Sequence, residues 1–185
     1  MEFKKVTREW DTLKKDAMER AKNAAPLVKE GKIVDAKDTV ALLEAVIKPY
    51  DKVNIEGNNQ KQADFLAKCL CQVDPAKIHD LHMVQSVLTL PEHLDVFEKG
   101  IAKKLDMSFS GPQAGRIAQF LQEGKLELGA IHTYLELYGR YFVDLTPRVA
   151  LVAATMADRE GNLFTGFSTE DTPAIVEATK FRQGI

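Results

Sequence analysis

Short β-branched apolar segments alternate along this chain with segments in which apolar residues recur at intervals of three and four. The first pattern is typical of strands and the second of amphipathic helices. Strand-like segments cover 51–56, 78–90, 105–109, 126–131 and 148–154. Because strands that alternate with helices in this way indicate βαβ crossovers, the sequence predicts an α/β fold. We expect a mostly parallel sheet with helices on both faces.

The two ends of the chain depart from this alternation. Residues 1–48 are predicted to form peripheral N-terminal helices, the second of them capped by Asp35, and residues 49–185 to form the α/β domain. Ala174–Ala178 is predicted to be a strand, and Ile185 to begin a further one. We therefore expect the chain to be an N-terminal fragment, truncated at its C-terminus.

Composition limits the function. The 185 residues are 45% hydrophobic and 28% charged, which is typical of a globular domain. The 25 lysines and arginines against 27 acidic residues give a net charge of −2, which argues against binding nucleic acid. No apolar run is long enough for a transmembrane segment or a signal peptide, so we expect a cytoplasmic protein. Cys69 and Cys71 are predicted to be reduced, buried thiols.

Two loops are the first candidates for a binding site. Gly57 follows a predicted strand and is succeeded by Asn58, Asn59 and Gln60, whose backbone amides could bond an acyl or phosphate oxygen. A second loop, at the end of another predicted strand, consists of Ser110, Gly111, Pro112 and Gln113. Ordinary turns are the alternative for both loops. Neither loop contains a dinucleotide fingerprint or a P-loop.

The four histidines point less clearly to a site. His79 and His82 lie three apart, but on a strand they face opposite ways, so we expect no metal site. His93 is predicted to be a solvated helix residue. His132, at a predicted strand end, is the histidine expected in a cleft, with a hydrogen-bonded structural role as the alternative.

The potential nucleophiles do not indicate a particular reaction either. The chain has no Gly-x-Ser-x-Gly motif, and its cysteines lie within a predicted helix, which argues against a serine or cysteine hydrolase. Four carboxylates remain, and their spacing favours none of them: Glu56, Glu136, Asp158 and Glu177. The segment 158–163 is predicted to be a tight turn, with a functional loop as the alternative.

Several of these segments together resemble one family, the α subunit of malonate decarboxylase. The segments are Ile55–Leu66, His79–Met83, Pro91–Leu94, Ser110–Gln113, Gly129–Tyr134 and Ala157–Leu163. The resemblance runs from about Val53 to the end. The last segment is similar to one found widely in glutamate-dependent coenzyme A transferases, whereas the first is the more specific for this subunit.

The resemblance implies the fold of the N-terminal half of a coenzyme A transferase and an acyl-carrier-protein transferase activity. Malonate would replace acetate on the thiol of a carrier protein, whose prosthetic group is a phosphoribosyl-dephospho-coenzyme A. Other malonate decarboxylase subunits would then decarboxylate the malonyl group. No cofactor is expected to bind this chain directly. The catalytic glutamate of related transferases belongs to their second half, and no segment here matches its motif.

One departure from the wider superfamily supports a carrier-bound substrate. Gly57–Gln60 stands where coenzyme A transferases have a glycine-rich coenzyme loop, which argues against simple coenzyme A binding. Two other functions stay open. The chain could belong to a citrate lyase-type or general acyl coenzyme A transferase, or it could be a non-catalytic assembly module that docks through its lysine-rich N-terminal helix.

Overall fold

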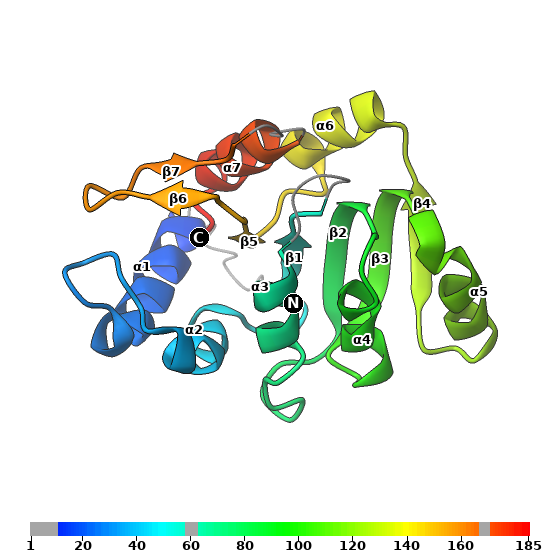
Figure 1. Ribbon diagram of the computed structural model, residues 1–185, viewed down its shortest axis with the longest axis horizontal. Helices are drawn as coiled ribbons and strands as arrows, with labels where there is room; N and C mark the ends of the chain where they lie inside the picture. The colour runs from blue at the N-terminus through cyan, green and yellow to red at the C-terminus, as the bar shows by residue number, and fades with distance from the viewer. Residues whose placement is uncertain (1–10, 58–62, 167–170) are drawn as a thin grey trace, which may run out of the picture.

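The computed structural model describes residues 11–57, 63–166 and 171–185, which form a parallel five-stranded sheet with helices on both faces (Figure 1). The strands of the sheet are β1 (Lys52–Ile55), β2 (Leu81–Val87), β3 (Ala102–Phe109), β4 (Glu127–Ile131) and β5 (Val149–Leu151). The α-helices are α1 (Thr12–Ala24), α2 (Thr39–Val46), α3 (Asp64–Leu70), α4 (Glu92–Glu98), α5 (Ala114–Gln122), α6 (Tyr134–Val143) and α7 (Thr172–Phe181). Short 3-10 turns are η1 (Ala25–Leu27), η2 (Ala36–Asp38) and η3 (Gly111–Gln113), and a hairpin is formed by β6 (Met156–Ala157) and β7 (Leu163–Phe164). The predicted α/β class is confirmed.

The strand order, β4-β3-β2-β1-β5, gives the sheet a topological switch point. The chain builds the sheet from β1 to β4 in one direction and then returns to place β5 on the other side of β1, with Val53 of β1 paired to both Met83 and Val149. The chain that leaves β1 leads to α3 on one face of the sheet, whereas the chain that leaves β5 leads, through the β6–β7 hairpin, to α7 on the other face. In open α/β sheets such a point, at the carboxyl ends of the strands, is where ligands bind.

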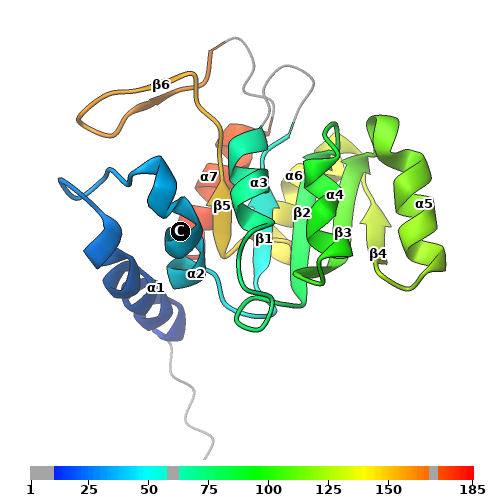
Figure 2. The ribbon, with the colours of Figure 1, turned by 60° about the horizontal axis from the view of Figure 1, so that its bottom comes forward.

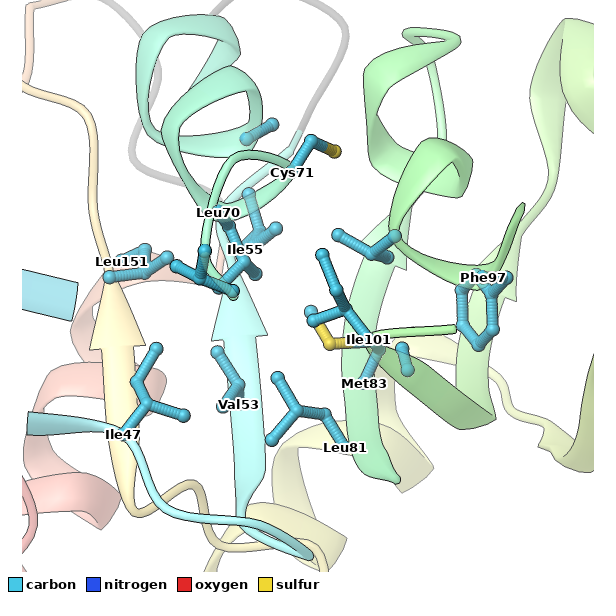
Figure 3. Packing of buried hydrophobic residues seen from close by; sticks show 14 of the residues in the cluster. Ile47, Val53, Ile55, Leu70, Cys71, Leu81, Met83, Phe97, Ile101 and Leu151 are labelled. Carbon is cyan, nitrogen blue, oxygen red and sulfur yellow. The ribbon is translucent and has the colours of Figure 1, made fainter. Parts of the chain in front are cut away.

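The larger core lies between the sheet and helices α2 to α5. Figure 3 shows Val53 and Ile55 of β1 beside Leu81 and Met83 of β2, with Leu70 of α3 packed over them. All five side chains are at most 1% exposed. Because successive strand residues point to opposite faces, the alternate residues of β1 and β2 are left for the other face.

Helices α6 and α7 cover that second face (Figure 2). They bury a smaller cluster around Val84 of β2, with Tyr141 and Ile175 fully enclosed. The hydroxyl of Tyr141 donates a hydrogen bond of 3.1 Å to Asp171, which ties α6 to the start of α7. Within the described residues no helix is both long and apolar enough to span a membrane.

The strand predicted at Ala174–Ala178 is wrong, because these residues lie in α7. Ile175, Ala178 and Thr179 are buried at helical spacing, and Pro173 occupies the first turn, where a missing N–H costs nothing. The adjacent β-branched residues favoured a strand only locally, and burial on the α6 side outweighs that preference. Ile185 does exchange two backbone hydrogen bonds with Arg148 and Ala150, as a strand residue beside β5 would.

A buried ion-pair network attaches α1 to the sheet. Arg20 is 3% exposed, pairs with Asp51 just before β1, and donates a 2.7 Å hydrogen bond to the carbonyl of Val46. Asp16, held by Arg20, Lys48 and Arg148, has its pKa lowered: burial opposes this shift, and the three cations outweigh burial. The predicted cap by Asp35 does not form, because Asp35 pairs with Lys29 instead.

Because the ion pair between Arg20 and Asp51 is buried, removing only one partner should strongly lower the free energy of unfolding. Arg20→Ala leaves the carboxylate of Asp51, 8% exposed, without its cation. We expect a loss of about 3–5 kcal/mol in the free energy of unfolding, measured by urea denaturation. Lys22→Ala, on the exposed side of the same helix, is the control and should change stability by less than about 0.5 kcal/mol. Equal losses in the two variants would contradict this assignment.

Candidate functional site at the carboxyl edge of the sheet

Gly57, just after β1, lies tightly against the end of β2. The carbonyl of Gly57 accepts a 3.1 Å hydrogen bond from the hydroxyl of Ser86. A Cβ at position 57 would lie 2.6 Å from the carbonyl oxygen of Val87 and 2.9 Å from Cε1 of His93. Only glycine fits this approach. The predicted site residues Asn58, Asn59 and Gln60, which follow Gly57, lie outside the described residues.

The loop after β3 lies against the same end of β2 from the other side. A 3.0 Å backbone hydrogen bond joins the N–H of Leu88 to Phe109, and the side-chain amide of Gln113 donates to Thr89 at 3.4 Å. Gly111 has φ +52° and approaches the carbonyl of Leu88. The structure thus brings Gly57 and the Ser110–Gln113 loop to one edge, on either side of residues 87–89.

The donors of the second loop can be identified from its backbone. Pro112 has no N–H, and the N–H of Gln113 is bonded to the carbonyl of Ser110 at 3.1 Å. The donors left for a ligand are the N–H of Gly111 and those of the first turn of α5, which have no partner within the helix. These groups, together with the positive end of the helix dipole, suit a carbonyl oxygen or an oxyanion.

His93 is a site residue that the sequence did not reveal, and its predicted solvent exposure is wrong. Its side chain is 0% exposed, and neither ring nitrogen has a hydrogen-bond partner within the part of the chain that the structure describes. Burial lowers its pKa to about 4, so the ring is neutral at pH 7. A buried imidazole with both nitrogens open, in contact with a glycine loop, needs a functional explanation.

Glu56 holds the first loop in place at the switch point. Its carboxylate is 0% exposed and accepts hydrogen bonds from the N–H of Ala153, at 2.8 Å, and from the hydroxyl of Thr172. The side chain therefore connects the end of β1 to the chain that leaves β5 and to the start of α7. Of the four carboxylates considered, this one alone is fully buried; Glu136 and Glu177 are exposed and Asp158 is partly exposed.

His132 lies elsewhere, at the end of β4, in a polar network on the α6 face. Its Nε2 is 2.7 Å from Asp106 and its Nδ1 is 3.2 Å from Glu136, while His82 contacts the other oxygen of Asp106 at 2.6 Å. Both nitrogens of His132 are thus engaged. Burial raises the pKa of Asp106, but the hydrogen bonds from the two histidines outweigh it and lower that pKa below its usual value.

Two further predictions concern nucleophiles and turns. Cys69 and Cys71 are free and buried, as predicted, and burial raises the pKa of Cys71 to about 11, which disfavours a thiolate. The 158–162 segment forms the predicted tight turn between β6 and β7, with Asp158 accepting from the N–H and the side chain of Asn162.

A doubly wound sheet with glycines at its carboxyl edge is typical of α/β proteins that bind ligands at that edge. Residues 9–185 match the family described as malonate decarboxylase, alpha subunit, transporter. The chain therefore belongs to the malonate decarboxylase α subunit family. The match includes the N-terminal helices, whereas the sequence motifs carried the resemblance only from about Val53.

Individual relatives agree with this family. Over 176 residues the chain is 63% identical to an acetyl-S-ACP:malonate ACP transferase from Malonomonas rubra, which covers 95% of this chain and 32% of that protein. A Pseudomonas malonate decarboxylase hetero-tetramer, crystallised with malonate, contains a chain with TM-score 0.93 and 55% identity over 97% of this chain and 33% of its own length. The malonate decarboxylase alpha subunit from Acinetobacter baumannii gives 0.91 and 50%, over 96% and 32%. The chain thus spans about a third of the length of these relatives.

Because Gly57 lies so close to β2, a methyl group added at this position should destabilise the protein, whereas one added at an unobstructed glycine should not. Gly57→Ala should lower the free energy of unfolding by about 1–3 kcal/mol, because the carbonyl of Val87 is backbone and cannot move aside cheaply. The control is Gly115→Ala in α5, where a Cβ meets nothing within 4 Å. That variant should gain about 0.5–1 kcal/mol. Chemical denaturation of both variants tests the pair, and an unchanged Gly57→Ala protein would contradict it.

The lowered pKa of His93 predicts a pH dependence of stability. The unfolded state takes up a proton near the ordinary pKa of 6.5, whereas the folded state resists protonation until about pH 4. Stability contributed by the neutral ring is therefore complete above pH 6.5 and falls as the pH drops, by roughly 3 kcal/mol in total. His93→Leu should remove this component. Denaturation at a series of pH values measures it, and parallel curves for wild type and variant would contradict the assignment.

Proposed function

We propose that this chain forms one wall of the active site of an acyl-carrier-protein transferase, which exchanges acetate for malonate on a carrier-protein thioester. The observation that carries the proposal is the placement of Gly57 and the Ser110–Gln113 loop on either side of residues 87–89, next to the switch point. The 63% identity to an acetyl-S-ACP:malonate ACP transferase supports the choice of reaction. The family's association with malonate decarboxylase supports the choice of acid.

The contribution of this chain is to orient the acyl group and to stabilise the oxyanion. Attack on a thioester carbonyl places negative charge on its oxygen, and fixed N–H groups stabilise that charge without reorganising. In the proposed site the N–H of Gly111 and the first turn of α5 serve the oxygen from one side. The amides of Asn58, Asn59 and Gln60, which lie outside the described residues, are proposed as further donors to the thioester.

The attacking carboxylate is proposed to come from outside this chain. Transfer by the glutamate-dependent route forms an acetyl-glutamyl anhydride and releases the carrier thiolate, which then attacks the glutamyl carbonyl, expels acetate and leaves a glutamyl thioester. Malonate attacks this thioester to give a malonyl-glutamyl anhydride and free thiolate. The thiolate then attacks the malonyl carbonyl, which forms malonyl carrier protein and restores the glutamate. Glu56 does not suit that nucleophilic role, because Ala153 and Thr172 hold its buried carboxylate. Its proposed role is to fix the loop that begins at Gly57.

His93 is proposed to position the first loop and the acyl group. Its ring contacts the backbone at Gly57, and its neutral state at pH 7 lets one nitrogen donate and the other accept a hydrogen bond. The prosthetic arm of the carrier, a phosphoribosyl-dephospho-coenzyme A, is proposed to enter at this edge, and further malonate decarboxylase subunits are the proposed partners.

The reaction can be tested with the complete polypeptide that contains this chain. Acetyl carrier protein is incubated with isotopically labelled malonate, and intact mass spectrometry follows the formation of labelled malonyl carrier protein. We expect exchange by the complete protein and none by residues 1–185 alone. His93→Leu in the complete protein should slow exchange by about 10- to 100-fold, because a 1 Å loss of alignment has effects of that size. His79→Leu, an exposed histidine at the opposite edge, should leave the rate unchanged.

Three outcomes would contradict the proposal. Exchange by residues 1–185 at the rate of the complete protein would show that no carboxylate from outside the chain is needed. A strong preference for free coenzyme A esters over carrier-bound ones would favour a general acyl coenzyme A transferase. Equal rates in the two histidine variants, with both folded by circular dichroism, would remove His93 from the site.

A further inference from the structure

A second site candidate lies at the other end of the sheet from the glycine loops. A cavity of about 440 Å³ opens on the α6 face, near the amino ends of β1 to β3. Its walls are formed by Lys52, His82, Lys104, Asp106, Gly129, Ala130, Arg140, Asp144 and Leu145. Lys52 begins β1 and His82 is the second residue of β2, whereas Gly57 follows the end of β1. The cavity is therefore separate from the carboxyl-edge site.

Most charges in the cavity wall compensate one another. The guanidinium of Arg140 donates two hydrogen bonds of 2.5 Å to the carboxylate of Asp144. The carboxylate of Asp106 accepts from His82 and His132. Position 129 must be glycine beside it, since a Cβ there would lie 2.0 Å from an oxygen of Asp106. The acidic groups of the wall are thus already occupied.

Two of the cavity's cations have no close partner among the described residues. Among the described residues, neither Lys52 nor Lys104 forms an ion pair or a side-chain hydrogen bond, although both line the cavity. Lys52 is half-buried, so its ammonium is less screened than one in open solvent. With three cations and two carboxylates in its wall, the cavity has a net charge of +1, which becomes +2 when His82 takes up a proton and is then complementary to a small dianion.

His82 adds a group that can respond to such a ligand. Its Nε2 contacts Asp106 at 2.6 Å, and because a carboxylate accepts hydrogen bonds, this nitrogen carries the proton. Among the described residues the other nitrogen, Nδ1, has no hydrogen-bond partner, and it belongs to a ring that lines the cavity. Burial lowers the pKa of His82, with Lys104 and Lys52 acting in the same direction and Asp106 opposing them.

We propose that this cavity binds a small dianion of the carboxylate or phosphate class between Lys52 and Lys104, and that His82 takes up a proton at Nδ1 as the dianion binds. The bound anion offsets the field of the two lysines, and the new N–H donates to it. Asp106, Asp144, Arg140 and, through Asp106, His132 are the other charged or titratable groups around the ring. The proposal does not depend on the reaction proposed above.

Binding can be measured on the 185-residue chain with defined anions. Sulfate represents the phosphate class because it stays a dianion, malonate represents dicarboxylates, and acetate is the monoanion control. Isothermal titration between about pH 6 and pH 8, in buffers that differ in ionisation enthalpy, gives affinity and proton uptake. Nuclear magnetic resonance of the histidine rings identifies the site. We expect saturable binding of a dianion, tighter at lower pH, with a shift of the His82 signals and little change at His79. Whichever of sulfate and malonate binds more tightly identifies the class of ligand.

Matched variants separate the cavity from general surface charge. The double variant Lys52→Gln, Lys104→Gln should weaken dianion binding by about tenfold. Lys103→Gln, Lys125→Gln removes two exposed lysines outside the cavity wall and should bind like wild type. His82→Gln should still bind but lose the pH dependence. No saturable binding of either dianion, equal weakening in both double variants, or an unchanged pH dependence in His82→Gln would overturn the proposal.

Discussion

The interaction on which the carboxyl edge depends is made by the buried carboxylate of Glu56, at the switch point of the sheet. It accepts from Ala153 and Thr172, so three segments that are far apart in sequence are joined at the end of β1. A buried carboxylate without such donors would destabilise the fold. These hydrogen bonds therefore stabilise the structure and also favour this one arrangement of the three segments. The position of Gly57, the next residue along the chain, depends on this contact.

The parallel sheet divides polar chemistry between its two ends. At the carboxyl end, glycines let the backbone of two loops approach β2, and the donors available there are mainly N–H groups. At the amino end, side chains provide the polarity, through His82, Asp106 and the two cavity lysines. Because all five strands are parallel, the loops with Gly57 and Gly111 lie at the opposite end from Lys52 and His82, and Asp106 extends the side-chain network along β3 to His132 after β4.

Much of the fold follows from local patterns, and its errors have local causes. The four strands β1 to β4 and the helices between them follow from apolar periodicity. Helix α6 was missed, although Thr133 and Glu136 form an N-terminal capping pattern, and Thr133 does accept from the N–H of Glu136. His93 was misassigned because a histidine after Pro91 is usually solvated at a helix start. Here that turn faces the Gly57 loop, and nothing in the local sequence indicates this.

The sequence by itself determined the α/β class, the family and the two glycine loops, because alternating periodicity and short turn motifs are properties of neighbouring residues. Only the tertiary structure decided that Gly57 and the Ser110–Gln113 loop flank the end of β2, that α7 is a helix, and that Glu56, His93 and Asp106 are buried. The physical reason is that burial and charge compensation arise from strand order, which joins residues as distant as Glu56 and Thr172. Local propensity carries no information about that order.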